Sequence, residues 1–399
     1  MSELPQELLV EILLRLPAED LAKFTAVCKS WNSVIKNPNF ISTHLQKTIS
    51  CTNLLLFRHC TFRTSEKRYR VEYSLRLDNK ALDEYKQLPI FPDIGGCLFR
   101  VAGSYNGLVC LVKDMESSYY GYTYNTFILW NPAIKKAIRL PEPSVRFGSH
   151  GRTFNGFGFD LKTNDYKLLR FVVLDDKEPN VEVEAEVYSL NANCWTSITS
   201  IAPNYIPRID YPRNYGNSFV NGAIHMLACD RKCGRKRNLI LAFDLSEEVF
   251  SEIPFPDHLS NALYLPAQLL KYRQSSIAIM TWERDPSLET HLWVIELWVM
   301  KEYGVATSWT KVLTKAAESV PRLLFFRQEE QVLVARKGGW IASIDIKSKQ
   351  SEVFGVQSLE SFLVVDSYVE SLVLLDKCCI KSRWDVISID EDDANSTQE

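Results

Sequence analysis

The stretch ILWNPAIKKAIRLP, residues 128–141, decides the fold because it is one copy of a unit that recurs along the chain. Apolar residues lead into a polar turn that begins at Asn131, and a second apolar stretch leaves it, which is the pattern of a β-hairpin. Equivalent pieces are VYSLNANCWTSI at 187–198, LAFDLSEEVFSEIPFP at 241–256 and SIDIKSKQSEVFGV at 343–356. The same hairpin is therefore expected four times.

The spacing of these hairpins indicates a ring of repeated sheets. Asn131 and Ser189 are 58 residues apart, and Ser189 and Asp244 are 55 apart. Asp244 and Asp345 are 101 residues apart, which is close to two units of about 50 residues. The stretch ELWVMKEYGVATSWTKV, residues 296–312, fills that longer interval with a wider turn. A period of this length with several strands in each unit is typical of β-propellers.

The number of units predicts an all-β domain over residues 52–390, built as a β-propeller of about six irregular blades. Five units fit between residues 100 and 355, and strands from residues 54–78 complete a sixth by joining FLVVDS and ESLVLLD near the C-terminus. Such closure would remove exposed sheet edges. Seven blades or a less regular ring are the alternatives. Outside the N-terminal region, only residues 311–319 carry a weak helical pattern.

The N-terminal region, residues 1–48, has a different pattern. LPQELLVEILLRLP, which starts at Leu4, is apolar at helical spacing, and we expect three helices over 6–16, 19–35 and 40–46. So few residues cannot bury both longer apolar helices against each other. Surplus apolar surface marks an interaction site, although both helices could instead pack on the β domain as an extra layer. The acidic residues 391–399 are expected to form a disordered tail.

Charge and composition exclude several classes of partner. The chain has 399 residues with 46 basic and 49 acidic side chains, so neither nucleic acid nor an acidic solvating role is expected. Residues 1–10 do not resemble a secretory signal, and no run of about 18 uncharged apolar residues is present to span a membrane. We therefore expect a soluble protein in the cytoplasm, the nucleus or both, with no membrane partner.

The ten cysteines do not predict a metal centre. Several lie in apolar runs, as Cys28 and Cys110 do, and are expected to be reduced, buried thiols. Cys229 with Cys233, and the adjacent pair at 378–379, are the closest approach to a ligand motif, but neither has a matching second pair nearby. No metal and no cofactor is expected.

The segment LPQELLVEILLRLPAEDLAKFTAVCKSWNSVIKNPNF, residues 4–40, resembles the F-box. The one departure is AED at 18–20, where F-box relatives often carry a basic residue followed by Ser. The β region resembles the kelch-like F-box-associated domain of plant F-box proteins in pieces such as GSYNGLVCL at 103–111 and VNGAIHML at 220–227. Within that family the chain is similar to the pollen S-locus F-box proteins and to their non-S relatives.

The resemblance implies a substrate receptor of a Skp–cullin–F-box ubiquitin ligase. The F-box would bind a Skp-type adaptor and, through it, a cullin and a RING protein, while the β domain holds a target protein, in the S-locus case an S-ribonuclease. Holding the target near the conjugating enzyme raises the effective concentration of its lysines, so this chain supplies no catalytic group. The expected adaptor-binding residues are Leu4, Pro5, Leu8, Ile12, Leu13, Leu16, Pro17, Leu21, Val27 and Trp31.

Target recognition is harder to locate. The run RKCGRKR lies between two expected strands and could present a cationic loop to an acidic target surface, or it could be an ordinary solvated loop. Its basic residues are Arg231, Lys232, Arg235, Lys236 and Arg237. Other connections at 114–125, 142–154, 203–217 and 283–290 are equally candidates, because loops on a rigid scaffold carry recognition.

Two further functions fit the same fold. Propellers also serve as scaffolds without any role in ubiquitination, and some are glycosidases or lyases. An enzyme of that kind needs paired carboxylates or metal ligands that converge on the central channel. The six histidines are scattered, and His225 sits in an apolar strand where a packing role is expected. A non-catalytic receptor is the main prediction.

Overall fold

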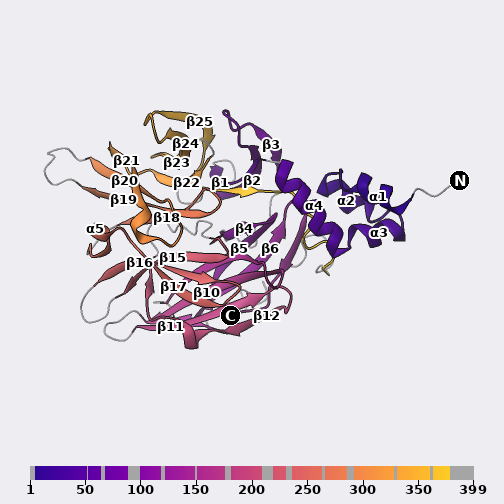
Figure 1. Cartoon of the computed structure of the whole chain (residues 1–399), viewed down its shortest axis with the longest axis horizontal. Helices are drawn as coiled ribbons and strands as arrows, with labels where there is room; N and C mark the ends of the chain where they lie inside the picture. The colour runs from indigo at the N-terminus through magenta and orange to yellow at the C-terminus, as the bar shows by residue number, and fades with distance from the viewer. Residues whose placement is uncertain are drawn as a thin grey trace, which may run out of the picture.

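The computed structural model describes residues 5–51, 53–63, 68–88, 99–117, 122–148, 151–175, 181–208, 219–230, 236–262, 266–284, 292–327, 330–359 and 363–377. Helices gather at the N-terminal end and project from one side of a ring of sheets (Figure 1). The predicted tail 391–399, Cys233 and Cys378 lie outside the described residues.

Four helices form the N-terminal helical unit within the described residues. They are α1 (Gln6–Leu13), α2 (Ala18–Phe24), α3 (Lys29–Ile35) and α4 (Pro38–Cys51). The third expected helix thus begins earlier and ends later, as α4. None of the helices in these residues has the length and apolar character needed to cross a membrane.

The single helix expected over residues 19–35 is wrong, because the structure divides it into α2 and α3. Thr25 ends α2, and its hydroxyl donates a hydrogen bond to the Ala22 carbonyl at 2.7 Å. Cys28 then has extended backbone, and its sulfur accepts a bond from the Trp31 amide at 3.5 Å, capping α3. Cys28 is consequently exposed, whereas the sequence predicted a buried thiol.

Twenty-six strands form six sheets in the described residues, which we number as blades 1–6. Blade 1 contains β1 (Leu54–Arg63), β2 (Arg68–Leu77), β3 (Glu84–Gln87) and β26 (Val364–Tyr368). Blade 2 contains β4 (Arg100–Tyr105), β5 (Leu108–Ser117), β6 (Tyr122–Asn131), β7 (Lys136–Arg139) and β8 (Phe147–Gly148). Blade 3 contains β9 (Arg152–Asp160), β10 (Asp165–Asp175), β11 (Glu182–Ser189) and β12 (Cys194–Ser197).

The second half of the ring repeats this plan. Blade 4 contains β13 (Ile206–Pro207), β14 (Phe219–Val220), β15 (Ala223–Asp230), β16 (Arg237–Asp244) and β17 (Val249–Pro254). Blade 5 contains β18 (Ala267–Tyr272), β19 (Ser276–Arg284), β20 (Trp293–Met300) and β21 (Trp309–Ala317). Blade 6 contains β22 (Arg322–Phe326), β23 (Gln331–Ala335), β24 (Trp340–Asp345) and β25 (Ser351–Gln357). The short helices are α5 (Asp257–Ser260), η1 (Thr199–Ile201) and η3 (Ala306–Ser308).

The six-bladed propeller predicted from the hairpin period is confirmed. β26, which holds most of the predicted FLVVDS strand, pairs with β1 so that Leu54 faces Tyr368 and Arg58 faces Val364. The two ends of the chain thereby complete blade 1, and no long edge of the ring is left open there. The other expected closing strand, ESLVLLD, is instead a series of turns beyond β26.

The four repeated hairpins owe their shape to one side chain at each turn. The Asp244 carboxylate accepts hydrogen bonds from the Ser246 and Glu247 amides, both at 2.8 Å. Asn131, Ser189 and Asp345 act in the same way, with bonds of 3.0, 3.0 and 2.7 Å from amides two or three residues further on. Short polar side chains that bind their own backbone in this way stabilise tight turns.

The weak helical prediction for residues 311–319 is wrong, because these residues lie mostly in strand β21. β21 pairs with β20 along its length, from Trp309 opposite Met300 to Ala317 opposite Trp293. The indole nitrogen of Trp309 also donates to the Pro254 carbonyl of blade 4 at 3.0 Å. Tertiary pairing of this kind overrides the high intrinsic helix propensity of Lys and Ala.

Two Asn-Gly hairpins offer a matched stability test. Gly107 and Gly222 have φ of +80° and +78°, a region that costs other residues about 1–2 kcal/mol. A Cβ on Gly107 would lie 2.4 Å from Ser371 Oγ, whereas one on Gly222 would meet nothing within 4 Å. We expect Gly107→Ala to lower the free energy of unfolding by about 2–4 kcal/mol, measured by urea unfolding.

Gly222→Ala is the control for this prediction, and it should show only the backbone cost of about 1 kcal/mol. Equal losses for the two variants would mean that the segment carrying Ser371 does not press on Gly107 in solution.

A buried ion pair within blade 3 is hydrogen-bonded to residues of blade 2 and of the segment that follows it. Arg170 on β10 and Glu186 on β11 are both inaccessible to solvent, and their side chains form a direct salt bridge. The Arg170 guanidinium also donates to Asn125 Oδ1 at 2.7 Å and to the Val145 carbonyl at 2.9 Å. The second Glu186 oxygen accepts from the Ser144 amide at 3.0 Å. The charges are thus compensated inside the ring.

Candidate functional site

Helix α1 has apolar residues on two sides. Leu13 is fully buried, while Leu8 and Ile12, one turn apart on the same face, are 53% and 51% exposed. Val27, in the turn after α2, is 59% exposed. Large apolar side chains with this exposure on a short helical unit are suited to a partner.

The inward side of the helical unit forms its own core. Leu13, Leu21 and Ile35 are completely buried, and Leu16 and Trp31 pack against the same cluster while half buried. A fully buried residue contributes to a partner surface only by holding its exposed neighbours in place. Among the predicted adaptor-binding residues, Leu13 and Leu21 therefore have packing roles in the free chain.

The remaining predicted residues lie at the helix ends. Pro5 and Pro17 are exposed at the N-caps of α1 and α2, where their backbone is extended and their missing amide costs no hydrogen bond. Leu4 lies outside the described residues. The structure thus brings together Leu8 and Ile12 on one helix face.

The helical unit also packs on the propeller. Ala133 and Ile134 in the β6–β7 turn belong to its apolar cluster, as do Leu372, Val373 and Leu375 in the segment after β26. The alternative that the helices pack on the β domain is therefore correct in part, and the interaction site stays a prediction. One side of the helices is seated on the ring, and Leu8, Ile12 and Val27 stay exposed.

We call this contact between the helical unit and the propeller the seat. Glu19, in the unusual AED stretch, stabilises the seat through ion pairs. Its carboxylate lies 2.5 Å from Lys86 Nζ of blade 1 and 3.1 Å from Lys135 Nζ of blade 2. Hydrogen bonds from Lys86 and then Lys135 lower the pKa of Glu19 to about 2. The departure from the usual F-box pattern thus supplies a contact between the two domains.

Replacing Glu19 with glutamine tests that contact. We expect Glu19→Gln to destabilise the seat by about 1 kcal/mol, seen as faster hydrogen exchange in α2. The Glu19 pKa is lowered from 4.5 to about 2 on folding, so its contribution is complete above pH 4.5 and disappears as the pH falls towards 2. The difference between the two proteins should shrink over that range.

Glu11→Gln removes a carboxylate of α1 whose one ion pair among the described residues is with Arg15, just beyond the end of α1, so it should leave exchange in α2 unchanged. The interpretation fails if this control variant and Glu19→Gln behave alike at neutral pH.

Asn131, predicted as a turn residue, has a second role that its sequence context does not reveal. Its side-chain amide donates to the carbonyls of Ser371 and Val373, at 3.0 and 2.8 Å. Lys136 Nζ likewise donates to the carbonyls of Leu375 and Lys377, at 3.1 and 2.6 Å. These bonds hold the C-terminal segment under the helical unit. Asn131 and its partner Ser371 are 240 residues apart in sequence, so no local pattern could reveal this contact.

The predicted basic loop is only partly within the described residues. Arg231, Lys232 and Arg235 lie outside them. Arg237 begins β16 and forms ion pairs with Glu252 at 2.7 Å and Asp230 at 3.4 Å. The hydrogen bond to Glu252 raises the pKa of Arg237. Its charge is therefore balanced within blade 4. Lys236 lies beside it, half buried.

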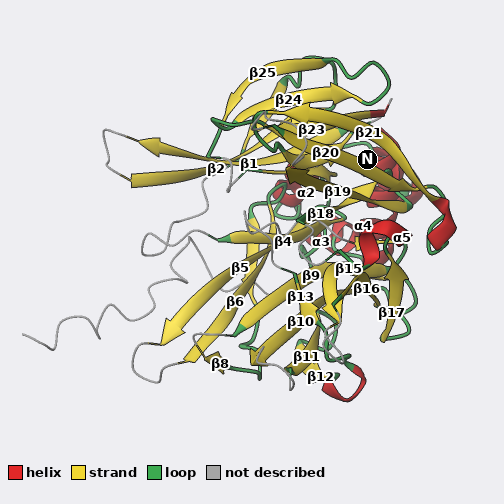
Figure 2. Cartoon of the chain, turned by 90° about the vertical axis from the view of Figure 1, so that its left-hand side faces the viewer, coloured by secondary structure: helices red, strands yellow, loops and turns green. Residues whose placement is uncertain are grey.

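The other loops predicted for target recognition connect strands at the opposite end of the ring from the seat. The β6–β7 turn, which carries Ala133, is at one end of blade 2, and the β5–β6 connection within 114–125 is at the other. Figure 2 shows the β1–β2 and β5–β6 hairpins extending to the same side. Many residues of these loops lie outside the described part of the chain.

No cluster of side chains suited to a metal ion occurs within the residues that the structure describes. His225, fully buried, has its Nε2 2.6 Å from the Tyr303 hydroxyl. This confirms the packing role expected for His225.

Comparison with known proteins agrees with this architecture. Residues 1–43 match the F-box domain model, and residues 97–375 match the model described as F-box associated beta propeller domain. The chain is 26% identical to F-box protein CPR1 of Arabidopsis thaliana over 397 residues, covering 94% of this chain and 89% of that protein. It is 28% identical to F-box/kelch-repeat protein At3g23880 of the same species, covering 81% of each.

Among solved structures, a six-bladed fungal lectin from Aleuria aurantia aligns with a TM-score of 0.40 and 10% identity, covering 73% of this chain and 88% of that one. The family models together match most of the chain, including both the helical unit and the propeller. The chain therefore belongs to the F-box proteins that carry an F-box-associated β-propeller domain.

Proposed function

We propose that the chain is the substrate receptor of a Skp–cullin–F-box ubiquitin ligase, in which the helical unit binds a Skp-type adaptor. The observation that carries the proposal is the exposure of Leu8, Ile12 and Val27 beside a packed apolar cluster in the same helical unit. Apolar anchors one helical turn apart suit recognition in a groove. We propose direct contact for these three and a supporting role for Leu13 and Leu21.

The seat on the propeller supports a proximity mechanism. Packing through Ala133 and Leu372, together with the Glu19 ion pairs, fixes the helical unit against the ring. A target bound to the propeller then keeps a defined direction from the adaptor. Holding its lysines near a ubiquitin thioester raises their effective concentration without any catalytic group from this chain.

The target is a protein held by the propeller loops in this proposal, with the basic residues of 231–237 as one candidate contact. The S-locus assignment and an S-ribonuclease target remain predictions from the resemblance alone. We expect the complex to act in the cytoplasm or the nucleus.

Affinity purification of the chain from cells treated with a proteasome inhibitor tests the proposal. We expect mass spectrometry to find a Skp-type adaptor and a cullin, together with proteins that accumulate only under inhibition. A second purification with the Ile12→Asp chain should lose the adaptor and cullin but keep the accumulating proteins. A wild-type chain that recovers no adaptor would favour a scaffold function instead.

A further inference from the structure

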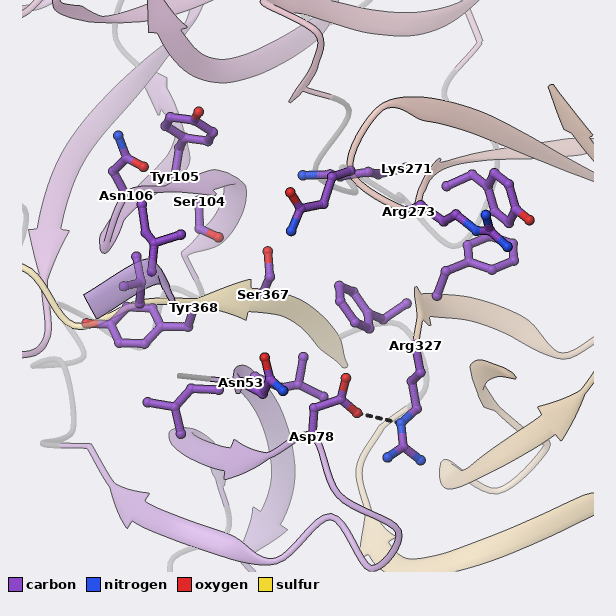
Figure 3. A pocket seen from close by; sticks show the side chains of 18 of the residues that line it. Asn53, Asp78, Ser104, Tyr105, Asn106, Lys271, Arg273, Arg327, Ser367 and Tyr368 are labelled. Carbon is purple, nitrogen blue, oxygen red and sulfur yellow. Dashed lines mark hydrogen bonds and ion pairs between the residues drawn. The ribbon is translucent and has the colours of Figure 1, made fainter. Parts of the chain in front are cut away.

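A cavity of about 890 Å³ opens at the centre of the ring. It is walled by the last residues of four inner strands, β4, β18, β22 and β26, and Ile49 of α4 stands at its rim. Figure 3 shows the side chains around it. The volume falls within the range of small-molecule sites. The cavity lies at the same end of the ring as the helical unit, away from the predicted target loops.

Positive charge exceeds negative charge in the wall of this cavity. The charged lining residues are Lys271, Arg273, Arg327, Lys347, Asp78 and Glu330. Asp78 is neutralised by Arg327, with Oδ1 2.6 Å from Nε. The Glu330 carboxylate forms ion pairs with both Arg273, at 3.7 Å, and Lys347, at 3.1 Å. Four cations therefore face two carboxylates among the described lining residues.

Lys271 is the cation that these carboxylates do not balance. It is the residue before the last in β18, and no hydrogen bond or ion pair joins its ammonium group to any part of the chain that the structure describes. Figure 3 shows Lys271 pointing into the cavity from one side and the Ser367 hydroxyl from the other. Ser367 is exposed although β26 is an inner strand, because its side chain opens into this space. An ammonium and a hydroxyl both donate to anions.

Aromatic side chains form another part of the wall, beside aliphatic and uncharged polar residues. Tyr272 and Phe326 pack edge to face with ring centroids 5.2 Å apart, and Tyr105 and Phe325 also line the cavity. Apolar surface combined with polar groups that fix orientation is typical of a ligand site. The wall therefore suits a flat apolar body that carries negative charge.

We propose that this cavity binds an anionic group, a carboxylate or phosphate, attached to an aromatic body, with Lys271 as its principal partner. The group can come from a free organic acid or from an acidic side chain of a peptide. The site does not depend on adaptor binding, because it lies in the propeller and is built from strands of blades 1, 2, 5 and 6.

Calorimetric titration of the full chain with benzene-1,3,5-tricarboxylate, at constant ionic strength, tests the site. We expect saturable binding that Lys271→Gln weakens at least about tenfold, the effect of losing one charge-assisted hydrogen bond. Lys271→Arg keeps the charge and should keep binding. Within the described residues the Lys271 ammonium group makes no hydrogen bond or ion pair that its removal would break, so folding should be unaffected.

Lys301→Gln is the control, since it removes one exposed lysine from blade 5 outside the cavity wall, and it should bind as the wild type does. Citrate, which lacks the ring, should bind more weakly than the aromatic acid. Equal binding by wild type and Lys271→Gln overturns the proposal.

A phage-displayed library of random dodecapeptides distinguishes the two sources. Enrichment of peptides with Asp or Glu beside an aromatic residue, lost on Lys271→Gln, supports a peptide ligand. Binding of the tricarboxylate without any such enrichment supports a free organic acid. Failure of both probes to bind in a Lys271-dependent way rejects the site, and adaptor recovery in the separate purification is unaffected by that result.

Discussion

Ile12→Asp is expected to weaken binding of a Skp-type adaptor at least about a hundredfold. Ile12 is 51% exposed on α1 and does not belong to the apolar cluster of the helical unit, so we expect a charge there to leave the fold intact. In a complex, the same position would bury an unpaired carboxylate in an apolar contact, which costs several kcal/mol. Surface plasmon resonance with purified adaptor measures the loss.

Val353→Asp provides the matched control, because Val353 is a β-branched residue that is 50% exposed on β25 of the propeller. It should leave adaptor affinity unchanged. Leu16 and Trp31 are poorer choices for this test, since both pack within the helical cluster and a charge would also disturb folding. Tight binding by the Ile12→Asp chain would remove α1 from the interface.

Arg170→Met is expected to destabilise the propeller by about 3–5 kcal/mol. The substitution removes a buried guanidinium and leaves the Glu186 carboxylate without its counter-charge in a solvent-free position. Asn125 and the Val145 carbonyl also lose their hydrogen-bond donor. Thermal unfolding followed by circular dichroism should show a transition several degrees lower.

The double variant Arg170→Met with Glu186→Leu separates charge from packing. Because replacing both members of a buried ion pair by apolar residues is often neutral, we expect it to recover most of the lost stability. If the double variant unfolds as early as the single one, the cost lies in the lost contacts to Asn125 and Val145.

The ring could be predicted from the sequence because each blade repeats one local device. Turn residues such as Asn131, Asp244 and Asp345 bind backbone amides only two or three positions further on. A short stretch of sequence is therefore enough to predict each turn. The break between α2 and α3 could not be predicted in this way. Phe24, Cys28 and Trp31 keep helical spacing across it, and only the local bonding of Thr25 and Cys28 reveals the gap.

The candidate interface was predicted in part. Helical spacing identified which residues are apolar, and it placed Leu8 and Ile12 on one face. It could not tell that Leu13 and Leu21 turn inward, because that depends on where the ring lies. The central cavity was missed entirely, since Ser104, Lys271 and Ser367 meet only when distant blades close into a circle.

The order in which the ribosome releases the chain gives the C-terminal segment a further importance. β26 and Leu372 emerge after the other strands of the ring, yet β1 needs β26 as its pairing partner and the helical unit needs Leu372 for its apolar cluster. A product of a premature stop codon before residue 363 would retain Leu8 and Ile12 and so could still occupy adaptors. It would also leave β1 as an open edge that invites aggregation. We expect such truncated products to act as dominant inhibitors of the intact protein.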